Sequence, residues 1–366
     1  LPCATMDDAA ALRKVVEHFG AHTNQLRIGG EAVLSSFGGE GCAFGAAGWK
    51  AVSDGTRFVP GFFGDVHAWV GWDGIGGGFN WNAAWPANNT DITWDSDDTW
   101  MRALDAAGGS KTYMAPVSPW FFTHFGKDTF NKNFLYRGDD WLLSTRWEML
   151  ISHRDKLDIV QVVSWNDFGE SHYVGPVEGV LPQGSEAWVE GYQHLGWLEM
   201  MQYHIQAFKT GSYPDIKKDQ AFLWARLFPR DAGAPTDDTG KPDHWDWTDD
   251  YLWSEVHLTE AATVTLFCSP SDPTSVMNST NTQDLPKGMS RMKLALVDPQ
   301  HNMKANSSGQ AGDGKCALGA EVWRGGSRVL SVQPGDMRFG VGNGRGGGGN
   351  GTVDRYNFNA FVANSG

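Results

Sequence analysis

The chain has 366 residues, including 46 Gly and 18 Trp, and its 29 Lys and Arg against 43 Asp and Glu give a formal net charge of −14. No stretch approaches the ~20 apolar residues that a membrane-spanning helix needs, and so acidic a chain is a poor partner for nucleic-acid phosphates. Its 41% hydrophobic content argues against disorder, so the sequence predicts a folded protein of about two domains.

One helix and five buried strands are predicted before residue 165. Residues 7–19 form an amphipathic pattern with two Asp at its start and Gly20 just past its end. Continuous apolar runs, typical of strands buried on both faces, occupy residues 32–37, 57–63, 78–81, 111–116 and 158–164. Further helices are expected near residues 94–107, 141–154 and 191–209. This alternation predicts a parallel α/β architecture and fits a (β/α) barrel, whose site lies at the carboxyl ends of its strands.

The pattern changes near residue 220. Short, partly alternating strand candidates occupy residues 221–227, 255–268, 293–297, 320–323 and 329–332. They predict an antiparallel β-sandwich. Seventeen of the 18 Trp lie at or before Trp253, so the composition changes as well. We therefore expect residues 1–218 to form the barrel and residues 219–366 an accessory sandwich domain, with the Gly-rich run 342–351 as a loop.

The strongest candidate for chemistry is the segment SWNDFGESHYVGP, residues 164–176, which follows a predicted buried strand. Asp167 and Glu170 lie three positions apart, a spacing that puts both carboxylates on one face if the segment turns helically. Such a pair is what glycoside hydrolysis requires, with one carboxyl protonated and the other ionised. The structural alternative is a helix start in which Asp167 is the cap and Glu170 its partner.

Other polar and aromatic residues follow predicted strands and are candidates for holding a sugar. Indole and phenol rings stack on sugars, and amides and carboxylates bind hydroxyl groups. The candidate substrate-binding residues are Trp165, Asn166, His172, Tyr173, Asp65, Trp81, Asn82, Trp85 and Glu40. For Glu40 and Asp65 a plain solvated loop is the competing interpretation, and for Trp81, Asn82 and Trp85 it is core packing.

The cysteines and glycosylation sequons favour a secreted protein. Four Cys without a zinc-type spacing favour two disulfides, and we prefer the pairs Cys3–Cys42 and Cys268–Cys316 because each stays within one domain. Sequons occur at Asn88, Asn278, Asn306 and Asn350. The chain starts LPCATMDD without an apolar leader, so we expect that a signal peptide was removed or that the chain is a fragment.

The segment SWNDFGESHYVGP resembles the fungal α-1,3-glucanases (mutanases) of glycoside hydrolase family 71. The resemblance extends to LPCATMDDAAALRKVV, NQLRIGGEAVLSSFGGEGC, RFVPGFF, FNWNAAWP, KTYMAPVSPWFF and GYQHLGWLEMMQYHIQAFKTGSYPDI, which together span most of residues 1–228. It implies a (β/α)8 barrel and inverting hydrolysis of α-1,3-glucan without a metal or other cofactor. The catalytic pair of the family matches Asp167, which we assign as general acid, and Glu170, which we assign as general base.

Two expectations follow from the resemblance. Inversion requires the two carboxyl groups ~6.5–9.5 Å apart, whereas a separation of ~5 Å favours retention. The LPC segment follows the third barrel strand in the family pattern, so this chain carries strands of about four to eight. We expect an N-terminal fragment, separate from this chain, to complete the barrel, because open strand edges aggregate.

Three functions remain open at the level of the sequence. The first is a secreted, endo-acting α-1,3-glucan hydrolase. The second is a non-catalytic glucan-binding protein that keeps the aromatic groove, and the third is a glycosidase of another linkage specificity. Release of reducing ends from insoluble α-1,3-glucan separates the first two.

Overall fold

The computed structural model describes residues 1–270, 278–296, 315–341, 347–348 and 352–366. The chain forms two compact units, each interrupted in sequence. The first comprises residues 1–84, 91–117 and 148–162, and the second comprises residues 85–90, 118–147 and 163–366. None of the helices in the described ranges has the length and apolar character that crossing a membrane requires.

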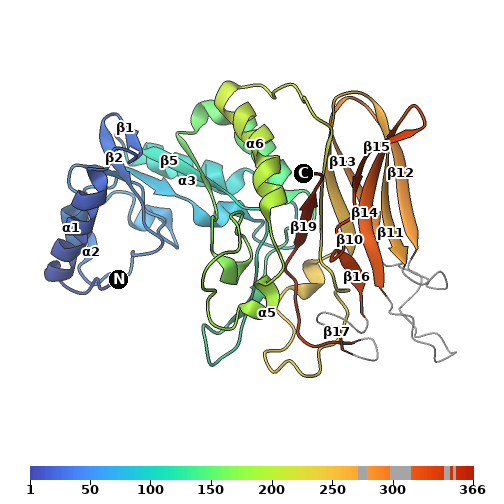
Figure 1. The fold of residues 1–366 in the computed structure, drawn as a ribbon. Coiled ribbons are helices and arrows are strands. Elements are labelled where there is room, and N and C mark those ends of the chain that lie inside the picture. Colours follow the sequence, from blue (N-terminus) through green and yellow to red (C-terminus); the bar gives the residue numbers. More distant parts are fainter. Residues whose placement is uncertain (271–277, 297–314, 342–346, 349–351) are drawn as a thin grey trace. The chain divides into compact units, whose positions relative to one another are not determined.

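The first unit is built mainly on parallel strands, with β1 added antiparallel to β2 (Figure 1). Its strands are β1 (Arg27–Ile28), β2 (Glu31–Leu34), β3 (Thr56–Phe58), β4 (Gly77–Phe79), β5 (Thr112–Val117) and β8 (Ile159–Val162). Its helices are α1 (Met6–Gly20), α2 (Gly45–Ser53) and α3 (Asp95–Ala106), with the 3-10 turns η1 (Val66–Ala68), η2 (Trp81–Ala84) and η3 (Arg154–Lys156). Helix α4 (Leu142–Ser152) continues from the second unit into the first.

All five strands that the sequence predicts before residue 165 are present and follow one another in chain order. β2 pairs with β3, β4 with β5, and β5 with β8, all in parallel. Hydrogen bonds from Gly76 N to Phe58 O (2.8 Å) and from Phe79 N to Pro60 O (2.9 Å) join β3 to β4. Within the described residues β2 and β8 do not pair with each other, so the sheet is open. The central strand β5 is buried throughout, whereas β2 and β8 are partly exposed.

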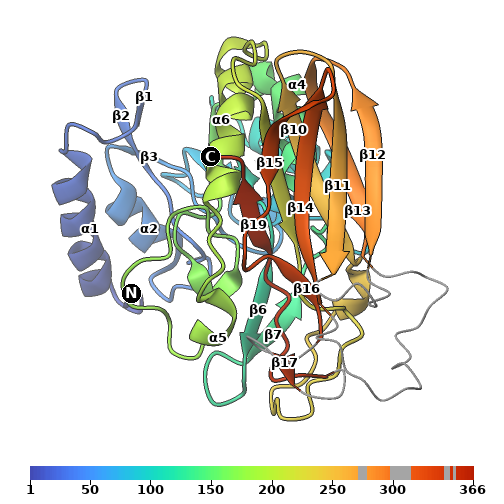
Figure 2. The same cartoon turned by 45° about the vertical axis from the view of Figure 1, so that its right-hand side comes forward.

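The second unit begins with a hairpin and two helices and continues into antiparallel sheets (Figure 2). The hairpin strands are β6 (Phe122–Phe125) and β7 (Lys132–Leu135), and the helices are α5 (Glu186–Val189) and α6 (Leu195–Thr210), with the 3-10 turns η4 (Phe168–Glu170) and η5 (Trp245–Trp247). The later strands are β9 (Gln220–Ala225), β10 (Tyr251–Leu258), β11 (Ala262–Pro270), β12 (Ser279–Leu285), β13 (Gly288–Ala295), β14 (Lys315–Arg324), β15 (Ser327–Val332), β16 (Arg338–Gly340), β17 (Gly347–Gly348), β18 (Thr352–Val353) and β19 (Phe361–Asn364).

Two antiparallel sheets share one apolar core. One has the strand order β13-β10-β9-β19, and the other has the order β12-β11-β14-β15 with β16 also paired to β14. Side chains of both sheets belong to the same buried cluster, for example Leu223 of β9 and Leu318 of β14. The single strand expected at residues 255–268 is wrong, because β10 and β11 are separate strands that join different sheets.

Strands β9 and β10 are buried on both faces, because alternate side chains meet different neighbours. Leu223 and Val256 point into the core shared by the two sheets. On the opposite face, Trp224 packs near Trp197 of α6, with ring centroids 6.3 Å apart, and Glu255 hydrogen-bonds α6. Antiparallel sheets commonly leave one face to solvent, but here α6 covers the second face of the sheet. That cover explains why the run at residues 221–227 is apolar throughout instead of alternating.

The predicted disulfides are present. Cys3 bonds Cys42 in the first unit, and Cys268 bonds Cys316 between β11 and β14 in the second. The sequon residues Asn88 and Asn278 are exposed. Asn306, Asn350 and all of the Gly-rich run except β17 lie outside the described residues.

Candidate active site

The loop that follows β8 is closed on itself by main-chain hydrogen bonds. Ser164 N donates to His172 O (2.9 Å), Val174 N donates to Ser164 O (3.0 Å), and Gly175 N donates to Trp165 O (2.8 Å). Between these links, turn η4 carries Glu170. These bonds satisfy polar groups of a partly buried backbone, so the loop is held in one conformation.

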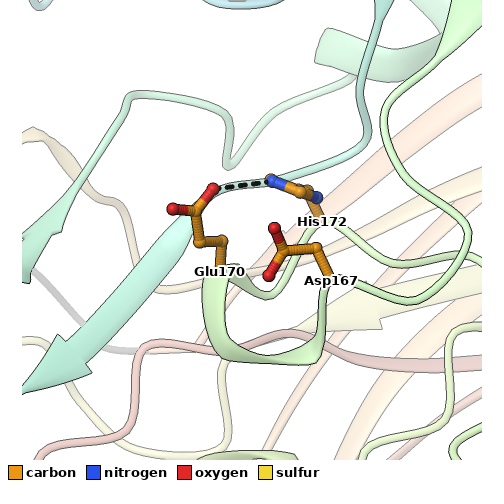
Figure 3. Close-up of side chains that lie close together, drawn as sticks. All are labelled: Asp167, Glu170 and His172. Carbon is orange, nitrogen blue, oxygen red and sulfur yellow. Dashed lines mark hydrogen bonds and ion pairs between the residues drawn. The ribbon is translucent and has the colours of Figure 1, made fainter. Parts of the chain in front are cut away.

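Within this loop three side chains converge (Figure 3). His172 is fully buried, and its Nε2 lies 3.0 Å from Glu170 Oε2. Its Nδ1 lies 2.8 Å from Ser164 Oγ, which also accepts a hydrogen bond from Asp167 N (2.9 Å). Since Ser164 Oγ already accepts one N–H, its own O–H is available to His172 Nδ1. That arrangement leaves Nε2–H of His172 to donate to the Glu170 carboxylate.

A second donor reaches Glu170 from outside the loop. Lys132, the first residue of β7, places its Nζ 3.1 Å from Glu170 Oε1. The two oxygens of Glu170 therefore each accept a hydrogen bond, one from the histidine and one from the lysine. The Glu170 side chain is only 15% exposed, so these contacts are little screened by water.

The pKa values of the two carboxyl groups are displaced in opposite directions. Burial by itself would raise the pKa of Glu170, but the hydrogen bonds from His172 and Lys132 and the electrostatic attraction to both side chains outweigh it and hold that pKa below its usual value. Partial loss of water raises the pKa of Asp167 and the negative charge of Glu170 adds to that effect, while attraction to His172 and Lys132 opposes it without outweighing it. Such a separation of two neighbouring carboxyl groups is the pattern of an acid and a base in one site. The capping alternative is not supported, because Asp167 makes no side-chain cap hydrogen bond to η4.

The spacing of the pair is short. One oxygen of Asp167, one oxygen of Glu170 and one ring nitrogen of His172 all lie within 4.8 Å of one another. Carboxyl groups of inverting glycosidases are ~6.5–9.5 Å apart and those of retaining ones ~5–5.5 Å. The close approach of the nearest oxygens of this pair is more like the retaining arrangement than the inversion that the resemblance implies. Among the described residues these three side chains are also grouped closely enough to hold a cation. Both Glu170 oxygens already accept hydrogen bonds, which favours acid/base chemistry over metal binding.

Two of the predicted substrate-binding residues are exposed beside the pair. Trp165 is 57% exposed and its ring lies against Gly175, where a Cβ atom would come within 2.7 Å of the indole. Asn166 is exposed as well. A flat apolar ring and an amide next to Asp167 are suited to a sugar.

Trp85, Tyr173 and His172 are buried, and their direct contact with substrate stays a prediction. Trp85 is 4% exposed and its Nε1 donates to Trp120 O (3.0 Å), while its ring centroid lies 5.9 Å from that of His172. Tyr173 is fully buried, donates its hydroxyl to Tyr192 O, and stacks on a histidine ring. These rings pack around the loop and support it.

The remaining candidates belong to the first unit. Glu40 and Asn82 are exposed, and Asp65 accepts a hydrogen bond from His67 N (3.0 Å) at the start of η1. Trp81 packs edge-on against Phe37, with ring centroids 4.5 Å apart. Their contact with substrate stays a prediction.

Lys132, Ser164 and Tyr136 are site residues that the sequence patterns did not single out. The sequence patterns predicted no strand between residues 116 and 141. A strand there would have placed Lys132, Phe134 and Tyr136 on one face, because alternate residues of a strand share a face. Burial raises the pKa of Tyr136, and the charge of Glu170 adds to it, while the Tyr136 ring packs near that of Trp85, with centroids 5.2 Å apart.

Comparison with known proteins yields three relatives. The chain is 35% identical to a glucan endo-1,3-alpha-glucosidase of Schizosaccharomyces pombe, over 73% of this chain and 64% of that protein. It is 28% identical to a mutanase of Penicillium rubens, over 84% of this chain and 66% of that protein. It is 29% identical to the ascus wall endo-1,3-alpha-glucanase of Schizosaccharomyces pombe, over 67% of this chain and 59% of that protein. The chain thus spans about two thirds or less of the length of these relatives.

A solved structure and a family also match. The endo-alpha-mannosidase of family GH99 from Bacteroides thetaiotaomicron is 14% identical, with a TM-score of 0.39 over 55% of this chain and 61% of that chain. The sequence model of glycosyl hydrolase family 71 matches residues 3–323. That match covers most of the chain and includes the loop with Asp167, Glu170 and His172, and the chain therefore belongs to glycosyl hydrolase family 71.

Proposed function

We propose that the protein is a glycoside hydrolase that cleaves internal bonds of α-1,3-glucan, with Asp167 as general acid and Glu170 as general base. The observation that carries this proposal is the opposite displacement of the pKa values of two adjacent carboxyl groups, of which Glu170 is the one that accepts the described hydrogen bonds from His172 and Lys132. The names of the relatives, endo-1,3-alpha-glucosidase, mutanase and endo-1,3-alpha-glucanase, support the substrate and the internal cleavage.

The reaction uses one water molecule and the two carboxyl groups. Asp167, whose pKa is raised, donates its proton to the glycosidic oxygen as the bond from that oxygen to the anomeric carbon breaks. Glu170, ionised, accepts a proton from the water whose oxygen forms the new bond to the anomeric carbon. After one turnover Glu170 holds a proton and Asp167 has lost one, and exchange with solvent restores both. Trp165 offers its exposed ring to a neighbouring glucosyl unit.

We further propose that the reaction inverts the anomeric configuration. The family resemblance supports inversion, and both oxygens of Glu170 already accept hydrogen bonds, which suits a base that orients water better than a nucleophile that must release its partners. The short spacing of the pair argues for retention, so the anomer of the first product decides between the two routes.

The same proposal extends to the architecture and the location of the protein. The five parallel strands in chain order and the partly exposed strands β2 and β8 support a (β/α)8 barrel that further strands complete. The shared core of the two antiparallel sheets supports a β-sandwich. Two disulfides and the exposed sequon residues Asn88 and Asn278 support secretion.

The test measures reducing ends released from insoluble α-1,3-glucan and from a panel of other α- and β-glucans. The wild type should release them from α-1,3-glucan, whereas Asp167→Asn and Glu170→Gln should lose about 10²-fold or more of the activity and still sediment with the glucan. The matched control is Glu178→Gln, an exposed carboxylate eight positions beyond Glu170. Near wild-type activity in either catalytic variant would refute the assignment. Binding without hydrolysis by the wild type would identify a glucan-binding protein, and cleavage of another glucan alone would identify a different linkage specificity.

A further inference from the structure

The catalytic turn η4 rests on the hairpin β6–β7. Phe125 and Lys132 are directly opposite each other in the register of the two strands. A Cβ atom at Gly169 would lie 2.9 Å from the ring of Phe125, so η4 packs against that ring without any intervening side chain. Phe125 itself is buried, with the indole of Trp188 at 5.0 Å between ring centroids.

The partner strand contributes the charge. Lys132 Nζ lies 3.1 Å from Glu170 Oε1, and the lysine side chain is 47% exposed while that of Glu170 is 15% exposed. The carboxylate is thus enclosed by protein on most sides and neutralised by a cation whose stem reaches in from the surface. A single cross-strand pair therefore fixes both the position of η4, through Phe125, and the charge next to its carboxylate, through Lys132.

We propose that Lys132 is a positioning residue that keeps Glu170 ionised, so that the acid/base pair carries its one proton on Asp167. This inference deepens the proposed function and rests on it for the catalytic readout. Two carboxyl groups this close share a proton unless something decides which of them keeps it. His172 contributes a hydrogen bond to Glu170 Oε2, and Lys132 adds a full charge at the other oxygen. Asp167 has no such cationic partner at hydrogen-bond distance among the contacts that the structure describes.

The experiment compares Lys132→Met, Lys132→Arg and the control Lys127→Met, an exposed lysine in the turn of the same hairpin. Kinetic constants are measured on soluble α-1,3-gluco-oligosaccharides across pH, and thermal melting verifies folding. Lys132→Met should lower kcat about tenfold or more with KM within about twofold, since a charge-assisted hydrogen bond to the base is lost. The acidic limb of the kcat/KM profile should move to higher pH, because this limb reports the ionisation of the base. Lys132→Arg should return the acidic limb of the kcat/KM profile to its wild-type pH, and Lys127→Met should have the same profile as the wild type.

A second readout does not depend on activity. The carboxyl carbon of Glu170 is followed by NMR in protein labelled with 13C-glutamate, with Glu170→Gln to assign the signal. Lys132→Met should raise the pKa of Glu170, and Lys127→Met should leave it unchanged. An unmoved NMR titration, or a loss confined to KM, would overturn the inference and make Lys132 a substrate-binding or surface residue. A moved titration in a protein that hydrolyses no glucan would uphold the role of Lys132 and refute the proposed function instead.

Discussion

Ser164 and His172 are joined twice across the catalytic loop: Ser164 N donates to His172 O (2.9 Å), and Ser164 Oγ lies 2.8 Å from His172 Nδ1. The first bond closes the loop, and the second orients the imidazole toward Glu170. The same hydroxyl oxygen accepts a hydrogen bond from Asp167 N. Ser164 therefore contacts Asp167 directly and Glu170 through His172. The geometry of the pair therefore depends on a residue that performs no chemistry itself.

Ser164→Ala is expected to lower kcat while leaving the protein folded. The change removes the hydrogen bonds to His172 Nδ1 and Asp167 N, and leaving a buried polar group unpaired costs about 1–3 kcal/mol, or about tenfold or more in rate. Ser164→Thr keeps the hydroxyl and should retain most of the activity, and Ser327→Ala, at an exposed serine, serves as the control. A wild-type kcat in Ser164→Ala would show that the Ser164 hydroxyl does not control the geometry of the pair.

The first product of hydrolysis is expected to be the β-anomer. A single displacement by water at an α-linked anomeric carbon inverts its configuration. Proton NMR of a soluble oligosaccharide digest, recorded before mutarotation, identifies the anomer. An α-anomer would mean retention, with Glu170 as nucleophile. That result would agree with the close approach of one Asp167 oxygen and one Glu170 oxygen, which lie within 4.8 Å of each other.

Gly169→Ala is expected to displace η4 and reduce both activity and stability. Its Cβ would lie 2.9 Å from the Phe125 ring, and overpacking of this kind costs about 1–3 kcal/mol. The smaller side chain in Phe125→Leu should recover part of the loss in the double variant, measured by urea unfolding and by kcat. Gly335→Ala is the control, because a Cβ there meets nothing within 4 Å. Equal losses with and without Phe125→Leu would show that the Phe125 ring is not the obstacle.

The second unit is expected to lose stability in acid through Glu255. Its Oε1 accepts hydrogen bonds from His204 Nε2 (3.1 Å) and His257 Nε2 (2.8 Å), and Ser144 donates to its other oxygen. Burial alone would raise the pKa of Glu255, but the two histidines outweigh it and hold the pKa far below the usual 4.5. A lowered pKa in the folded state means that the ionised group stabilises the fold above about pH 4.5, and that this stability is lost as the pH falls below that value.

Glu255→Gln tests this acid dependence. Replacing a buried carboxylate that accepts three hydrogen bonds weakens all of them, and a hydrogen bond to a charged group contributes about 1.5–3 kcal/mol, so the variant should be less stable than the wild type by at least about 3 kcal/mol at pH 6. The difference should shrink toward pH 3, because Glu255 takes up a proton there in the unfolded protein while it stays ionised in the folded one. The measurement is the free energy of unfolding in urea at several pH values, with the exposed Glu190→Gln as the control. A constant difference across that range would contradict the linkage.

Local patterns were sufficient to locate the parallel strands and to single out the proposed catalytic pair. Continuous apolar runs identified β2, β3, β4, β5 and β8 to within a few residues. Of these strands, β4 and β5 are buried at every position, as such runs predict, whereas β2, β3 and β8 are partly exposed. Asp167 and Glu170 were recognisable because they belong to one short segment after a strand. Composition and domain logic likewise predicted both disulfide pairs correctly.

What the sequence alone determined is the order of the strands and the identity of the two carboxylates, because both depend on residues that are neighbours in the chain. Only the tertiary structure decided which of the two carboxyl groups has its pKa lowered, since Lys132 reaches Glu170 from 38 residues away through the packing of a hairpin that no pattern had predicted. It also decided that Trp85 and Tyr173 are buried supports while Trp165 is exposed. Burial and charge pairing arise from contacts between segments that are distant in the sequence. The periodicity of residues along the chain does not predict such contacts.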